Sequence, residues 1–141
     1  MQNPGKQIRS NPQQSQRSAV VTVELAIVLP VLIILVLGIV ESCNLFYIKQ
    51  SLTISAYEGA RAAITKGMAV SSISARCSQV LSDRRIASGA IQVTPDTPSS
   101  GAYGTYITVR VQAPYSANTL IPGWMFGGTT LQTSVRMMKE Y

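Results

Sequence analysis

Residues 20–40 read VVTVELAIVLPVLIILVLGIV and decide the fold of this 141-residue chain. Every residue of the stretch is apolar except Thr22, Glu24, Pro30 and Gly38. About 20 such residues, rising about 1.5 Å each, cross a hydrocarbon core about 30 Å thick, whereas a soluble core helix of this length would keep a polar face. The stretch therefore predicts a membrane-spanning helix.

Glu24 is the ionisable residue of this stretch. A carboxylate at the centre of a membrane helix costs about 2.5 to 3.5 kcal/mol, but the first turn of a helix that begins near Val20 is a milder place, because water and the helix dipole favour an anion there. Two interpretations stay open. Glu24 either caps the helix at the membrane interface or pairs with a cation released by cleavage or assembly, such as a free α-amino group at Val20.

Pro30 is expected to kink this helix, because it lacks an amide hydrogen and leaves the carbonyl of Ala26 without its helical partner. Membrane helices tolerate such a proline where neighbours or water satisfy the carbonyl. The kink is either harmless or a flexible point that lets the helix leave the bilayer and pack against sister helices.

Charge is distributed unevenly along the chain. The net charge is +6, and the cations Lys6, Arg9 and Arg17 precede the first acid, Glu24. This bias places the N-terminus in the cytoplasm and sends the C-terminal part across the membrane. Without residues 1–19, nine basic and six acidic side chains remain, and a net charge of +3 does not indicate nucleic-acid binding. Residues 1–18 have almost no apolar side chain and are expected to be disordered in isolation.

Missing residue types exclude several kinds of catalytic site. The chain has no histidine, which rules out Ser/His/Asp and Cys/His arrangements. A metal site would have to use six scattered acids and two thiols, and no glycine pattern of a phosphate-binding loop occurs. We therefore expect no enzyme, cofactor, metal, nucleic acid or small-molecule substrate.

The predicted helix continues past the membrane to about residue 65, with Gly67 as its stop. Apolar residues recur at steps of three or four and form one face of this helix, and the residues at the far end of the face are small. The face consists of Leu45, Ile48, Leu52, Ala56, Gly59 and Ala63. A second amphipathic helix fits residues 72–88, with Ser71 as its N-cap and Gly89 at its end. If it folds back, Cys77 lies opposite about residue 57 and about 20 Å from Cys43, so two free thiols are expected.

Period-two alternation after Gly89 predicts an antiparallel sheet of two or three strands. A short one holds Ile91 and Val93, and longer ones cover residues 106–113 and 131–137. So few strands need cover, and we expect them to pack on the small-residue face of the long helix. The predicted fold is α+β and pilin-like, with a cytoplasmic basic leader at 1–19, the transmembrane half of the helix at 20–41 and an exported domain at 42–141.

An apolar connection joins the last two strands. Its large side chains are Leu120, Ile121, Trp124, Met125 and Phe126. The first interpretation is that the aromatic residues plug the open edge of a thin core. The second is a contact surface for a partner or for the membrane interface, because long loops in compact domains are often functional.

Three stretches, VELAIVLPVL (23–32), GIVE (38–41) and EGARAA (58–63), resemble the TadE-like family of minor pseudopilins from tight-adherence (Tad/Flp, type IVc) pilus systems. The third contains Gly59, Ala60 and Arg61, which are similar to the family's glycine-alanine-arginine signature and are expected to pack closely. The ending at 134–140 is a weaker likeness.

The resemblance implies cleavage by an aspartate prepilin peptidase on the cytoplasmic side, just before the apolar segment. Carried onto this sequence, the bond is Ala19–Val20 and Glu24 becomes the fifth residue of the mature chain. Ala19 stands where the family has glycine, and Leu25 where Phe or Tyr is common.

The leading hypothesis is a non-enzymatic minor pseudopilin of the bacterial inner membrane that takes part in pilus assembly. Its partners are the prepilin peptidase, other pilin or pseudopilin subunits and the assembly platform, and the α-amino group of Val20 pairs with Glu24 of a neighbouring subunit. The alternative is an uncleaved single-pass assembly or envelope protein that binds a partner through its exported domain. A membrane-tethered enzyme with Ser/Lys or Asp chemistry is the third hypothesis.

Overall fold

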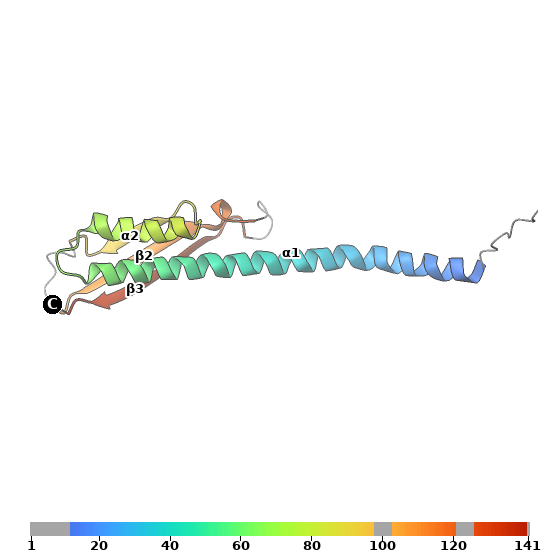
Figure 1. Cartoon of the computed structure of the whole chain (residues 1–141), viewed down its shortest axis with the longest axis horizontal. Coiled ribbons are helices and arrows are strands. Elements are labelled where there is room, and N and C mark those ends of the chain that lie inside the picture. Colours follow the sequence, from blue (N-terminus) through green and yellow to red (C-terminus); the bar gives the residue numbers. More distant parts are fainter. Residues whose placement is uncertain (1–11, 98–102, 121–125, 141) are drawn as a thin grey trace, which may run out of the picture. The chain divides into compact units, whose positions relative to one another are not determined.

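The computed structural model describes residues 12–97, 103–120 and 126–140. The chain forms two compact units, an N-terminal unit, Met1–Ile39, and a C-terminal unit, Val40–Tyr141. The elements in chain order are α1 (Pro12–Ala63), α2 (Val70–Asp83), β1 (Ala90–Thr94), β2 (Tyr106–Pro114), the 3-10 turn η2 (Tyr115–Ala117) and β3 (Thr130–Met138). The fold is α+β, as predicted (Figure 1).

Helix α1 begins at Pro12, so the helix start expected near Val20 is wrong, and residues 12–18 are helical as a continuation of the apolar stretch. Proline suits the first helical position, because its φ angle is already helical and the first turn leaves its missing amide hydrogen without a partner in any case. Gln13, Gln14 and Arg17 then favour a helix. Polarity alone therefore gave a poor estimate of order next to a strong helical segment.

The C-terminal unit is built on the last turns of α1. The apolar face predicted there is buried: Ile48, Leu52, Ala56 and Ala63 are at most 1% exposed, and Gly59 is buried with them. Helix α1 ends at Ala63, and Gly67 adopts a φ of 78°, which reverses the chain toward α2. Figure 1 shows α2 lying alongside this part of α1.

Helix α2 starts and ends earlier than the sequence indicated. Its N-cap is Ala69, without a side-chain cap, and Ser71 lies inside the helix. Its end comes before Gly89 because Arg85 takes a left-handed φ of 56° and the amide of Ile86 donates to the carbonyl of Leu81 at 2.9 Å. This is a helix-ending turn of the Schellman type formed without glycine.

The three strands form an antiparallel sheet in the order β1-β2-β3. In its register Val109 of β2 lies between Val93 of β1 and Val135 of β3. The alternating residues Ile107, Val109, Val111 and Ala113 of β2 are fully buried, as their period-two pattern predicted. The opposite face of the sheet is polar, and there the Arg136 guanidinium carbon lies 4.0 Å from the centroid of the Tyr106 ring.

Both cysteines are free thiols, as the predicted helix geometry required. Cys77 is buried, and its S–H donates to the carbonyl of Ser55 at 3.4 Å, while the Ser55 hydroxyl donates to the carbonyl of Cys77 at 3.0 Å. Cys77 therefore lies opposite residues 55–59 of α1. Cys43 is exposed.

Candidate functional site

The apolar stretch of α1 is exposed to solvent in the described part of the chain. Each valine, leucine and isoleucine from Val20 to Val40 is at least 36% exposed. Burying one such side chain is worth about 1.5 to 3 kcal/mol, so transfer of the whole stretch from water to lipid is worth on the order of tens of kcal/mol. Among the described residues, α1 supplies one helix that is long and apolar enough to cross a membrane.

Ala19, Val20 and Glu24 lie within two turns of one another on this exposed part of α1. Glu24 makes no hydrogen bond or ion pair with any described residue, although its neighbours Val23 and Leu25 are apolar and 60% exposed. Its carboxylate is thus presented on an apolar surface, with no partner among the residues that the structure describes. The peptide bond between Ala19 and Val20 is helical, so a peptidase that cuts there has to unwind the helix locally.

Pro30 lies inside α1, which is helical on both sides of it. Because proline has no amide hydrogen, the carbonyl of Ala26 lacks its helical hydrogen bond. The expected role of Pro30 as a flexible point stays a prediction.

Gly59 lies at a close approach of α1 to α2 and β2, and Ala60 is next to it. A Cβ atom built on Gly59 would overlap the sulfur of Cys77 and lie 3.2 Å from Cγ1 of Val109. Ala60 is fully buried beside it. Arg61, in contrast, is exposed. The three signature residues therefore do different things: two of them allow close packing, and the third projects to the surface.

Glu41 lies in the GIVE stretch quoted above, and nothing in the sequence indicated that its side chain is buried. It is 1% exposed. Its Oε1 accepts a hydrogen bond from the Thr119 hydroxyl at 2.6 Å, and its Oε2 has no partner among the described residues. Burying a carboxylate oxygen without a hydrogen bond costs free energy, so the burial of Glu41 by itself destabilises the domain.

The segment after β2 is tied to α1 around Glu41. The Tyr115 hydroxyl donates to the backbone carbonyl of Glu41 at 3.3 Å, and the Asn44 side chain donates to the carbonyl of Asn118 at 2.9 Å. Burial raises the pKa of Tyr115 above its ordinary value of 10.0, and the nearby side chain of Glu41 raises it further. These contacts fix the start of the apolar connection against α1.

Of the apolar connection, the structure describes the two ends. Leu120 is 65% exposed, and Phe126 packs edge-on against Tyr115 with ring centroids 5.7 Å apart. Ile121, Trp124 and Met125 lie outside the described residues. Phe126 thus sits on the core as the plug interpretation expects, and a partner surface stays a prediction.

Residues 19–61 match the family model described as TadE-like protein. The match covers the exposed apolar part of α1, Glu24, Glu41 and the signature that ends at Arg61. It confirms the resemblance found in the sequence and links the chain to a family of Tad pilus systems. No curated protein matches the chain, and no solved structure does.

Proposed function

We propose that this chain, TadE-like over residues 19–61, is a minor pseudopilin that takes part in assembling a Tad-type pilus and catalyses no reaction. The observation that carries the proposal is the family match, which includes the stretch 20–40 of α1, where the large apolar side chains and Glu24 are exposed. Such a helix suits storage in a membrane followed by packing against other helices. The basic residues before it favour the bacterial inner membrane, with the N-terminus in the cytoplasm.

In this proposal Glu24 sets the register between subunits. A prepilin peptidase cuts at Ala19–Val20, and the new α-amino group of Val20 pairs with Glu24 of a neighbouring subunit. In a surrounding of low dielectric, opposite charges attract strongly, and a carboxylate left without its partner is costly. A subunit in the wrong axial position would bury Glu24 alone, so the pair favours one register.

The test combines the mature N-terminus with one substitution. Mass spectrometry of the assembled protein is expected to find a chain that begins at Val20. Glu24→Val is expected to leave membrane insertion unchanged and to abolish incorporation into the pilus or its assembly, because the variant offers no carboxylate to the amine. Thr22→Val, which changes a neighbouring polar residue without removing a charge, is the matched control.

Two results would contradict this function. An intact Met1 in the working complex supports the uncleaved tether that binds a partner through its exported domain. Normal assembly by the Glu24→Val variant removes the charge-pairing mechanism.

A further inference from the structure

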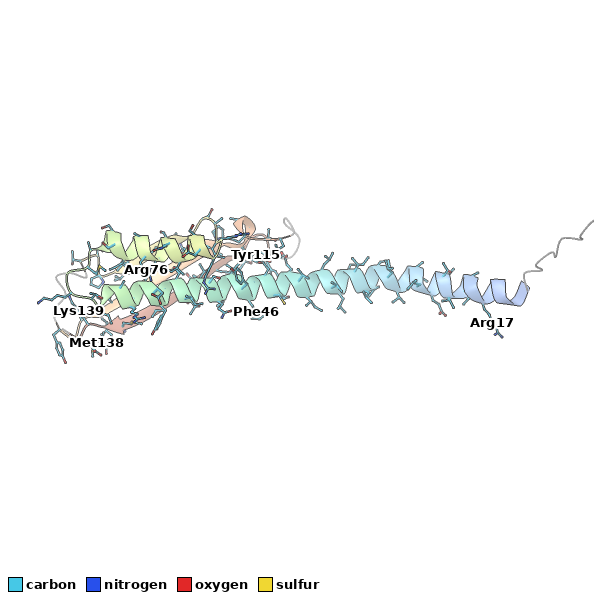
Figure 2. The ribbon with its side chains drawn as sticks, viewed as in Figure 1. Arg17, Phe46, Arg76, Tyr115, Met138 and Lys139 are labelled. Carbon is cyan, nitrogen blue, oxygen red and sulfur yellow. The ribbon has the colours of Figure 1, made fainter. Side chains whose placement is uncertain are left out.

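A groove with two arginines lies between the end of α1 and helix α2. It has a volume of about 720 Å³ and is open to solvent. Its charged lining is Glu58, Arg61 and Arg76, and Ala62, Met68 and Ala75 contribute apolar surface. Figure 2 places Arg76 on α2, next to the helix that carries Glu58. All of these residues belong to the C-terminal unit.

The charges in this groove are unbalanced. From the spacing in the sequence, Glu58 and Arg61 lie one turn apart, but the structure pairs Glu58 with Arg76, at 3.7 Å between Oε2 and Nη2. Arg61 has no ion pair or hydrogen bond within the part of the chain that the structure describes. One carboxylate therefore faces two guanidinium groups, and the free one lies at the last position of the TadE-like match.

The existing ion pair does not close the groove. The side chain of Arg76 is 51% exposed and that of Glu58 29%, and exposed pairs of this kind contribute little to stability. Arg76 also donates to Oε1 of Gln79 at 3.4 Å, a long contact. A ligand carboxylate can thus reach Arg61 directly and compete for Arg76, and a guanidinium binds a carboxylate through two parallel hydrogen bonds.

The lining favours a peptide over a phosphate group. Glu58 would repel a doubly charged phosphate at Arg76, whereas a polypeptide can place a carboxylate at Arg61 and an apolar side chain on Met68 and Ala75. The groove also lies about 30 Å along α1 from Val40, where the apolar stretch ends, and this exceeds the thickness of one headgroup layer. A lipid headgroup is therefore the weaker candidate.

We propose that this groove binds an acidic segment of another polypeptide, with a carboxylate of that segment paired to Arg61. The signature arginine then serves recognition, while the adjacent Gly59 and Ala60 serve packing. The proposal does not depend on cleavage at Ala19 or on the pairing of Glu24, so either can fail without the other.

The experiment uses the full chain in nanodiscs of phosphatidylcholine, which carry no net charge. A fluorescein-labelled peptide of alternating glutamate and alanine is titrated by fluorescence anisotropy. Arg61→Gln is expected to weaken its binding about tenfold, the loss of one charge-assisted contact. Arg110→Gln, which removes another exposed arginine, on β2 and outside the groove, is expected to have no effect. Arg61→Glu is expected to bind a peptide of alternating lysine and alanine instead.

Several outcomes would overturn the proposal. Equal losses in the Arg61→Gln and Arg110→Gln variants would mean general attraction to a cationic surface. Equal binding of a glutamine-alanine peptide would mean that no carboxylate is read. Absence of binding by the unchanged chain at about 1 mM peptide also counts against it. Binding to phosphatidylglycerol vesicles that depends on Arg61, without peptide binding, would assign the groove to a membrane surface.

Discussion

The two halves of α1 differ in the exposure of their apolar side chains, although they belong to one helix. From Val20 to Val40 its large apolar side chains are all exposed, whereas from Ile48 to Ala63 its apolar face is almost completely covered by α2 and the sheet. The first half carries branched residues all around, and the second carries one stripe that narrows to alanine and glycine. A helix that is apolar on all sides stays exposed in the described structure, whereas a helix with one apolar face buries that face in the core of its own domain.

The largest expected effect is on the free energy of unfolding when a leucine is replaced by alanine in each half of α1. Leu52→Ala should lower the free energy of unfolding of the C-terminal unit by about 2 to 5 kcal/mol, because Leu52 is fully buried and leaves a cavity. Leu32→Ala, at a position that is 56% exposed in the other half, should change it by less than about 0.5 kcal/mol. Chemical unfolding of the full chain in detergent, followed by circular dichroism, measures both. Similar losses would show that the two halves share one packing unit.

Gly59 sharpens the account of the covered half. Gly59→Ala should destabilise the C-terminal unit by about 1 to 3 kcal/mol through overlap with the Cys77 sulfur. Gly128→Ala is the control, because nothing lies within 4 Å of a Cβ there. Adding Cys77→Ala to Gly59→Ala should recover part of the loss, measured as a coupling in a double-mutant cycle. Strict additivity would mean that the close approach is not what requires glycine.

Glu41 lies at the junction of the two halves. Glu41→Ala should cost about 1 to 3 kcal/mol, because the hydroxyl of Thr119 loses its acceptor. Glu41→Gln keeps an acceptor and removes the buried charge, so it should be less destabilising than Glu41→Ala in thermal unfolding. If the two variants are equally unstable, the negative charge itself stabilises the fold, and a cationic partner for Oε2 has to be sought.

The smallest effect is on alkaline stability. The pKa values of Tyr115 and Cys77 are raised by burial above their ordinary values of 10.0 and 9.0, so the folded state holds these protons more tightly than the unfolded chain does. Their contributions are complete below pH 9 and fall as the pH rises through the raised values. Tyr115→Phe should reduce the loss of stability above pH 10, while Tyr57→Phe, at a half-exposed position, should not. An unchanged alkaline profile in the Tyr115→Phe variant would contradict this assignment.

Much of the fold could be predicted from the sequence because it depends on short-range patterns. The apolar stretch, the stripe from Leu45 to Ala63 and the alternation around Val109 each report a period that near neighbours establish. The helix start at Pro12 and the end of α2 were predicted incorrectly, because boundaries depend on single turns rather than on a period. Glu24, by its position, and the signature around Gly59 were visible in the sequence, although their roles in assembly are proposals.

The sequence by itself determined which stretch is apolar enough to cross a membrane, where a helix has one apolar face and which strands alternate, since the side chains along a single element carry that information. Only the tertiary structure decided that Glu41 is buried beside Thr119 and that Cys77 lies against Gly59. It also decided that Glu58 forms its ion pair with Arg76 and not with Arg61. These pairs join residues far apart in the chain. Their contacts follow from how the helices and strands pack, and no pattern along a single helix or strand specifies which residues of another element it will meet.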